Sequence, residues 1–309
     1  MIHHPGRVSI IGAGTLGGTI AYSLMMAKIA QEILLVDLSI NIVQGQVLDL
    51  SEAAANTGVV IRAGTFKEAG QSSVIIVTAD AQSLSNESRS EWLMRSRRLF
   101  LSIASSLSPV PKDTLIVITS DPVDLYVQFF QSYFPHVPTD RIFGIGTTMA
   151  TERFRTWIGD MTDCQDCITD AYCIGTQKTP IVVWNHAKFK SNSISTLPLL
   201  VAERARLETI VSEHRSNLIR ERKGRAWYGT AAVMTRLTKA LLCPDLPSVI
   251  WVLSVHVPRL DSCISWPVIL GTTGIQSLVQ LPLDEIESAK VMKVVESNMM
   301  DFQTSMGRT

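Results

Sequence analysis

A glycine-rich turn near the N-terminus has the residue types and spacing of a ligand site. Gly12, Gly14 and Gly17 form a GxGxxG pattern between a short β-branched run and an apolar-periodic segment. The first glycine permits a tight turn, the second lets a ligand approach the backbone, and the third lets the following helix pack on the strand. Asp37 ends the next strand-like run, where a carboxylate accepts hydrogen bonds from a ribose diol and repels a 2′-phosphate. The pattern predicts a dinucleotide site that prefers NAD to NADP, and the alternative is that the glycines only form a tight turn.

Alternating strand-like and helical runs surround this turn. The expected strands are Arg7–Ile11, Glu32–Val36, Val74–Thr78 and Thr114–Thr119, and the expected helices are Leu16–Met26, Ile42–Ala54, Arg89–Leu107 and Leu125–Phe134. The strands are short, continuous apolar runs, as a parallel sheet covered on both faces requires. The first half is therefore predicted to be an α/β Rossmann domain with a doubly wound parallel sheet and right-handed crossovers.

The second half has a different pattern and is predicted to be a mixed α/β domain. Its expected helices are Ala150–Ile158, Val201–Arg220, Trp227–Leu242 and Asp284–Phe302. Its expected strands are two within Ile168–Trp184, then Val249–Val257 and Val268–Gln280, the last broken by Gly271–Gly274. The change in pattern divides the chain into residues 1–146 and 147–309.

The composition limits the classes of partner. The chain has 309 residues, 46% of them hydrophobic and 18% charged, with a formal net charge of zero. Neutral charge favours neither nucleic acid nor an anionic membrane as a partner, and no apolar run is long enough to span a bilayer. Five cysteines and no apolar leader segment favour a reducing, cytoplasmic location. Cys164 and Cys167 form an isolated CxxC, for which ordinary thiols are expected rather than a zinc or redox site, so no metal is predicted.

A series of further motifs resembles a known family along essentially the whole chain. Besides Gly12–Gly17 and Asp37, the motifs are Glu87-Ser88-Arg89, Ser120-Asp121-Pro122-Val123-Asp124, Gly144-Ile145-Gly146-Thr147, Arg153-Phe154-Arg155, Lys223-Gly224 and Pro267-Val268-Ile269-Leu270-Gly271. In this order they resemble the lactate/malate dehydrogenases, nearer the lactate branch. The resemblance implies hydride transfer between NAD and a 2-hydroxy acid, a mobile loop over the site, and a homodimer or homotetramer. It also implies a cofactor site formed by Gly12, Gly14, Thr15, Leu16, Gly17, Asp37, Thr78, Ala79 and Ser120.

The catalytic positions that the resemblance implies are only partly retained. The loop arginine corresponds to Arg89 and the carboxylate-binding arginine to Arg153. The proton-exchanging histidine, its aspartate partner and the substrate-positioning asparagine correspond to Gln177, Ala150 and Asp121. An amide cannot exchange a proton near neutral pH, and losing acid–base help costs about 10²–10⁴ in rate. An ionised Asp121 about 4 Å from a substrate anion would repel it by roughly 4 kcal/mol.

These losses predict a catalytically impaired domain that acts as a regulatory or scaffold module. A more specific resemblance is to the dehydrogenase-like half of the ubiquitin-conjugating enzyme E2 variant fusions. It implies a role in ubiquitin conjugation and protein sorting, with ubiquitin-pathway proteins as partners. NAD binding is expected to be weak or absent, because Asp80 replaces a glycine that the family places along the pyrophosphate.

Two alternatives remain open. The first is an active NAD-dependent 2-hydroxy acid dehydrogenase whose proton comes from water or from Lys178, which lies in the same Gly175–Pro180 turn as Gln177. A lysine can act as an acid where burial depresses its pKa. The second is an interaction module that binds no cofactor, which Asp80 favours and the glycine-rich turn opposes.

Overall fold

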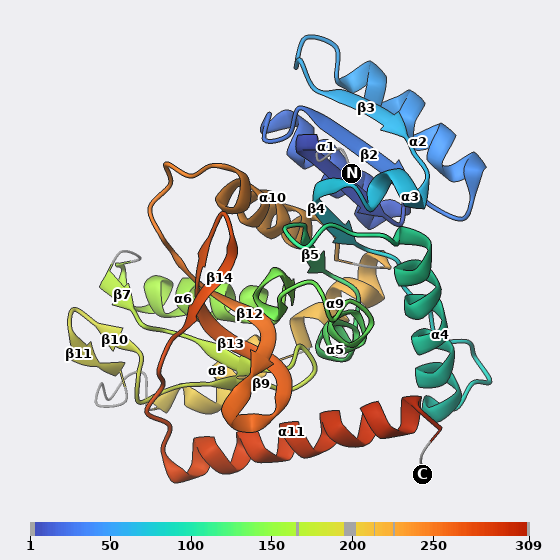
Figure 1. The fold of residues 1–309 in the computed structure, drawn as a ribbon. Coiled ribbons are helices and arrows are strands. Elements are labelled where there is room, and N and C mark those ends of the chain that lie inside the picture. Colours follow the sequence, from blue (N-terminus) through green and yellow to red (C-terminus); the bar gives the residue numbers. More distant parts are fainter. Residues whose placement is uncertain (1–3, 165–166, 195–201, 213, 225, 308–309) are drawn as a thin grey trace.

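One β-sheet runs through both halves of the chain in the computed structural model (Figure 1), which describes residues 4–164, 167–194, 202–212, 214–224 and 226–307. The sheet order is β3-β2-β1-β4-β5-β6-β12-β13-β8-β9, with β14 paired to β13. The strands are β1 His4–Ile11, β2 Glu32–Val36, β3 Val60–Ala63, β4 Ser72–Val77, β5 Leu115–Ile118, β6 Ile142–Gly144, β8 Cys173–Gly175, β9 Pro180–Val182, β12 Ile250–Val257, β13 Ser262–Gly271 and β14 Gly274–Leu278. Strands β1 to β6 pair in parallel, and the remaining pairs are antiparallel.

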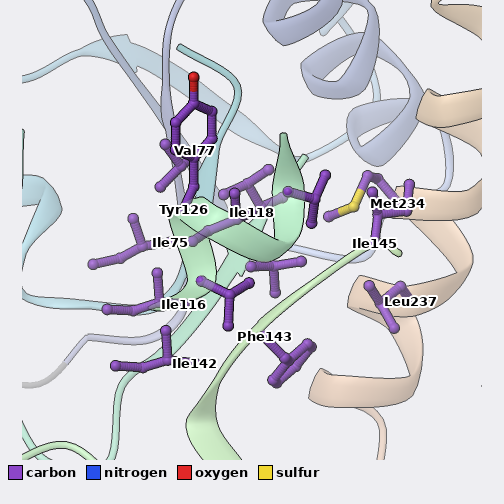
Figure 2. Close-up of a cluster of buried hydrophobic side chains, with 14 of the residues drawn as sticks. Ile75, Val77, Ile116, Ile118, Tyr126, Ile142, Phe143, Ile145, Met234 and Leu237 are labelled. Atoms are coloured by element: carbon purple, nitrogen blue, oxygen red, sulfur yellow. The ribbon is translucent and has the colours of Figure 1, made fainter. Parts of the chain in front are cut away.

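The parallel strands are buried on both faces, which explains their continuous apolar sequences. Ile75 and Val77 in β4 and Ile116 and Ile118 in β5 have no measurable exposure. Figure 2 shows these side chains in one cluster with side chains from the following helices and from β6. The predicted Rossmann-type sheet is confirmed, and the parallel pairing of β1, β4 and β5 places the loops that follow them at the same edge.

Helices connect the strands and join the two halves. They are α1 Thr15–Met26, α2 Ile40–Ala53, α3 Phe66–Ala69, α4 Arg89–Leu107, α5 Val123–Tyr133, α6 Thr148–Thr162, α8 Arg204–Val211, α9 His214–Lys223, α10 Tyr228–Leu242 and α11 Glu285–Ser305, with 3-10 turns at Thr139–Arg141 and Pro258–Leu260. Helix α10 packs on α1, and α11 packs on α4. Figure 1 shows α11 extending along one side of the molecule to the end of α4. The second half therefore contacts the first through two separate helix pairs.

One sequence prediction in the second half is wrong. The single helix expected over Val201–Arg220 is two helices, α8 and α9, because Ser212 takes an extended conformation that ends α8; residues 201 and 213 lie outside the described residues. The break expected at Gly271–Gly274 is the turn of the antiparallel β13–β14 hairpin, in which Gly274 has a φ of +107°, and β13 begins at Ser262 rather than at Val268. A small sheet of β7 Ile168–Thr169, β10 Lys188–Phe189 and β11 Asn192–Ser193 was not anticipated.

The CxxC pair also differs from expectation. Cys164 and Cys167 form a disulfide just after α6, with their Cα atoms 5.5 Å apart, which is within the range that such a bond needs. The prediction of ordinary thiols at these two positions is therefore wrong. Among the described residues, no helix is long and apolar enough to cross a membrane.

Candidate functional site

The glycine-rich turn after β1 depends on two of its glycines for its shape. Gly12 has a φ of +108°, and a Cβ atom there would lie 2.7 Å from Oγ1 of Thr78. A Cβ atom on Gly17 would lie only 1.9 Å from the carbonyl oxygen of Gly12, so α1 packs on the turn as the spacing predicts. The side chain of Thr78 donates a hydrogen bond of 2.8 Å to that same oxygen. The turn is thus held between β1, β4 and α1.

The N-terminus of α1 leaves room for a ligand. Gly14 is the residue before the helix, and a Cβ atom added to it would meet nothing within 4 Å. Thr15, the first helical residue, is exposed. Asp37 follows β2 and accepts hydrogen bonds from the backbone N–H groups of Ala13 (2.8 Å) and Ser39 (3.0 Å). A carboxylate thus lies beside the open helix end, which is the arrangement that holds a ribose next to a pyrophosphate.

The loops after β4 and β5 complete this edge of the sheet. The Ser120 hydroxyl donates a hydrogen bond to the carbonyl oxygen of Ala79, which links the two loops. The backbone N–H of Ala79 bonds to the carbonyl oxygen of Ile11 at 2.9 Å. The structure therefore brings the predicted cofactor residues of β1, β4 and β5 together, and these residues fit a dinucleotide.

Next to this edge lies a small cavity of about 80 Å³ that collects charged residues from three parts of the chain. Arg89 and Asp121 come from the first half, Lys178 comes from the turn between β8 and β9, and Asp301 comes from α11. Trp92, Pro122, Asp124, Thr176, Thr179, Val294, Ser297 and Asn298 also line the cavity. Two cations and at least two carboxylates therefore face one small space.

Arg89 is positioned by the start of α4 and by α11. Ser88 caps this helix, accepting a hydrogen bond from the N–H of Glu91, whose side chain in turn accepts one from the N–H of Ser88. The Arg89 guanidinium pairs with the Asp301 carboxylate in a two-pronged contact, with Nε 3.2 Å from Oδ1. Sequence reasoning missed Asp301, because an aspartate on an amphipathic terminal helix gives no signal of its role.

Gln177 has a structural contact rather than an acid–base partner. Its side-chain amide donates a hydrogen bond of 3.1 Å to the carbonyl oxygen of Gly146, just before α6. The turn that carries it is closed by a hydrogen bond of 3.1 Å from the N–H of Thr179 to Oγ1 of Thr176. Gly175 before the turn has a φ of +95°, so it needs glycine. Lys178 is exposed at the tip and lines the cavity, whereas Gln177 does not.

The remaining predicted positions lie on α6. Ala150 is buried, and Arg153 follows it by three residues, so the two lie on the same side of the helix. The Thr151 hydroxyl of this helix accepts a hydrogen bond of 3.0 Å from the N–H of Cys173, so α6 packs against β8, the strand that leads into the Gln177 turn. Arg153 is not among the residues lining the cavity.

The three histidines whose side chains the structure describes have partners outside the cavity. His136 bonds to the carbonyl oxygen of Val110 at 2.9 Å, His186 stacks on Tyr172, and His256 lies 3.5 Å from Asp261. None of these three lines the cavity. Within the described ranges, no group of three or more His, Cys, Asp or Glu side chains could hold a metal ion.

Asp124 is a buried carboxyl at the inner wall of the cavity. It is 4% exposed and accepts a hydrogen bond of 2.6 Å from the Ser254 hydroxyl of β12. Burial raises the pKa of Asp124 to about 7, the Ser254 hydrogen bond acts against this, and the negative charge of Asp121 raises the pKa further. Asp121 and Asp124 both line the cavity.

A second and larger cavity, of about 340 Å³, lies between α6, α10 and the start of β12. Its walls are mostly apolar, with Arg155, Arg236, Lys239 and Glu152 among its lining residues. Arg236 and Glu152 form an ion pair. Sequence reasoning did not anticipate this cavity, because its walls come from segments far apart in the sequence.

Comparison with known proteins identifies the family of both halves. Residues 6–144 match the lactate/malate dehydrogenase NAD binding domain, and residues 147–300 match the lactate/malate dehydrogenase alpha/beta C-terminal domain. L-lactate dehydrogenase A of Rhizopus oryzae is 30% identical over 299 residues, covering 96% of this chain and 92% of that protein. L-lactate dehydrogenase 1 of Staphylococcus aureus (strain bovine RF122 / ET3-1) is 28% identical, covering 92% of each chain.

Solved structures show the same fold. A lactate dehydrogenase enzyme, MGS-M5, from a Medee basin deep-sea metagenome library superposes with a TM-score of 0.90 at 20% identity, over 98% of this chain and 99% of that one. The minor L-lactate dehydrogenase from Enterococcus mundtii in a ligand-bound form gives a TM-score of 0.89 at 22% identity, over 97% and 98% of the two chains.

These relatives overturn the prediction of a catalytically impaired module that acts in ubiquitin conjugation and protein sorting. The relatives described above are named lactate dehydrogenases, and the match covers nearly their whole length. Nothing in these matches points to a ubiquitin-conjugating fusion. Gln177, at the position where the family has a histidine, removes one possible proton donor. The fold still places Arg89, Lys178 and the dinucleotide turn at one edge of the sheet. With both domains matched and a relative at 30% identity over nearly its full length, the chain belongs to the lactate/malate dehydrogenase family.

Proposed function

We propose that this protein is an NAD-dependent oxidoreductase that interconverts a small 2-hydroxy acid and its 2-oxo acid, with Lys178 in place of a histidine as the proton donor. The observation that carries the proposal is the cavity in which Lys178 and Arg89 meet the loop after β5. This loop and the glycine-rich turn emerge from the same edge of the parallel sheet, where ligands bind in open α/β folds. The names of the relatives support this reaction class.

The cofactor proposed is NAD rather than NADP. Its pyrophosphate would lie at the open N-terminus of α1 beside Gly14, and its ribose diol would bond to Asp37, whose charge disfavours a 2′-phosphate. When bound, NAD supplies or accepts the hydride. Asp80 follows the loop residue Ala79, and its negative charge is expected to weaken the affinity for the pyrophosphate.

The roles of the cavity residues follow from their charges. Arg89 and Lys178 attract the substrate carboxylate and the developing negative charge on the substrate oxygen. Lys178 has a proton to donate, whereas the amide of Gln177 has none to give and is bonded to the backbone of Gly146.

Replacing Lys178 by methionine tests this assignment. The Lys178→Met variant should bind NADH normally but lose about 10²–10⁴ in kcat, because general acid–base help is removed. The Lys112→Met variant is a matched control, because Lys112 is also exposed but precedes β5, at the opposite end of the strand from the cavity.

Two outcomes contradict the proposal in different ways. Unchanged kcat in the Lys178→Met variant would exclude Lys178 as the proton donor while leaving the reaction class intact. The reaction class itself would be contradicted if the wild-type protein bound NADH but turned over none of a panel of 2-oxo acids.

We also infer a homo-oligomer, either a dimer or a tetramer. Leu38, Ile40, Ile42 and Leu48 lie in or next to α2 and leave 77%, 69%, 47% and 69% of their surface exposed. A group of exposed apolar side chains on one element is typical of a protein–protein interface. Light scattering should show a dimer or larger species, and an Ile40→Glu, Leu48→Glu variant should be smaller. An unchanged mass for the variant would place the interface elsewhere, and a monomeric wild type would contradict oligomerisation.

A further inference from the structure

The cavity beside the dinucleotide site is suited to a ligand that carries both charges. Arg89 and Lys178 face it from two elements, and Asp121 and Asp301 face it from two others. A 2-oxo acid is a simple anion, so it can use the cations and is repelled by the carboxylates. A zwitterion can pair with both sets of side chains.

Asp121 is the cavity carboxylate that directly follows Ser120, one of the predicted cofactor residues, in the chain. It lies in the loop after β5, and the Ser120 hydroxyl donates a hydrogen bond to the carbonyl oxygen of Ala79 in the loop after β4. Asp121 lines the cavity together with Arg89 and Lys178, and its negative charge raises the pKa of the buried Asp124 in addition to the larger effect of burial. A negative oxygen that develops beside this carboxylate is disfavoured, whereas a protonated nitrogen there is stabilised.

The absence of a histidine at Gln177 fits the same kind of substrate. Reduction of a carbonyl requires a proton for the oxygen as well as a hydride for the carbon. A protonated imine already carries its proton: the carbon takes the hydride, the π electrons of the C=N⁺ bond become the nitrogen lone pair, and a neutral amine results. A reduced nicotinamide dinucleotide is the reductant and is oxidised in the same step, so no side chain has to supply a proton.

We propose that the site reduces protonated 2-imino acids to secondary amino acids, with Asp121 pairing with the iminium nitrogen and Arg89 and Lys178 attracting the carboxylate. This rests on the proposed function, because it uses the same cofactor and the same cavity. It adds a substrate class that the 2-oxo acid reaction does not include.

Competition between two substrate forms tests the proposal on the full chain. NADH oxidation is followed with pyruvate alone, with pyruvate plus methylamine, and with the cyclic imine 1-pyrroline-2-carboxylate. We expect the imines to be favoured at least about tenfold in kcat/KM, because one ion pair replaces one repulsion. In the Asp121→Asn variant this preference should fall at least about tenfold, because the charge is removed at nearly constant shape.

Asp301→Asn is the matched control, because it removes another carboxylate from the same cavity. Asp301 pairs with Arg89, so its loss should change carboxylate binding for oxo and imino acids alike and leave their ratio unchanged. A readout without turnover is calorimetric titration of proline and lactate into the NAD-saturated protein. Asp121→Asn should weaken proline binding at least about tenfold and should not weaken lactate binding.

The outcomes separate this inference from the proposed function. The 2-imino acid assignment would be overturned if pyruvate were reduced without any preference for the imines. It would also be overturned if the wild type and Asp121→Asn bound proline with equal affinity, and either result would leave the proposed oxidoreductase activity intact. Failure to reduce either class with NADH bound would overturn both. Loss of the preference in Asp301→Asn to the same extent would overturn the specific role of Asp121.

Discussion

Replacing Asp124 by asparagine should make the stability of this protein less dependent on pH. The side chain is buried against β12, and an asparagine can keep the 2.6 Å hydrogen bond from Ser254 through its amide oxygen. The substitution therefore removes an ionisable group at nearly constant shape. Any change in the pH dependence of unfolding can then be assigned to the charge.

The magnitude follows from the pKa of the buried carboxyl. Burial is the main reason that this pKa lies at about 7 rather than at its ordinary value of 3.8. The folded state therefore holds a proton that the unfolded state has lost, at every pH between these values. This contribution to stability is complete below pH 3.8 and is lost as the pH rises to about 7. A pKa difference of about three pH units, at about 1.36 kcal/mol per unit, corresponds to about 4 kcal/mol in the free energy of unfolding.

Urea unfolding of the wild type and the Asp124→Asn variant between pH 4 and pH 9 measures this effect. The free energy of unfolding of the wild type should fall relative to that of the variant as the pH rises, by up to about 4 kcal/mol, and the difference should level off above pH 7. Parallel curves for the two proteins, or a wild type that gains stability relative to the variant with rising pH, would refute the buried-carboxyl reasoning.

Three further predictions address the rest of the site. Gly17→Ala should abolish saturable NADH binding in calorimetry, because its Cβ would overlap the carbonyl oxygen of Gly12; unaltered affinity would show that α1 does not pack on the turn as described. Asp301→Asn should lower the KM for 2-oxo acids severalfold by releasing Arg89 from its ion pair, and a raised KM would indicate that the pair holds the arginine in place for substrate. Alkylation of the unfolded, unreduced protein should label three of the five cysteines, since the CxxC pair is bonded; labelling of all five would contradict the disulfide.

Sequence reasoning succeeded where short-range patterns determine the structure. The GxGxxG spacing and continuous apolar strands predicted the dinucleotide turn and the parallel sheet, because both depend on residues close together in the chain. Helix α4 has the bounds that the sequence predicts, and in the structure Ser88 and Glu91 form a capping box at its start. Asp284 was likewise identified as the cap of α11.

The features that sequence reasoning missed depend on contacts between distant segments. The pairing of Arg89 with Asp301 joins residues far apart in the sequence, and no local pattern marks it. The meeting of Lys178 with Asp121 in one cavity needs the turn of the second half to fold over the loop after β5. The sequence names Lys178 as an alternative proton donor, but only the fold shows that it shares a cavity with Arg89 and Asp121.

The most direct test of the proposed function is to follow the transferred hydrogen itself. The wild-type protein is incubated with pyruvate and longer 2-oxo acids together with NADH carrying deuterium at the transferable position, and the products are examined by mass spectrometry. We predict 2-hydroxy acids that carry deuterium on the former carbonyl carbon, and their loss in an Asp37→Arg variant, in which the dinucleotide site is disrupted. Absence of labelled product in the wild type, or an equal amount from the Asp37→Arg variant, would contradict an NAD-dependent oxidoreductase at this site.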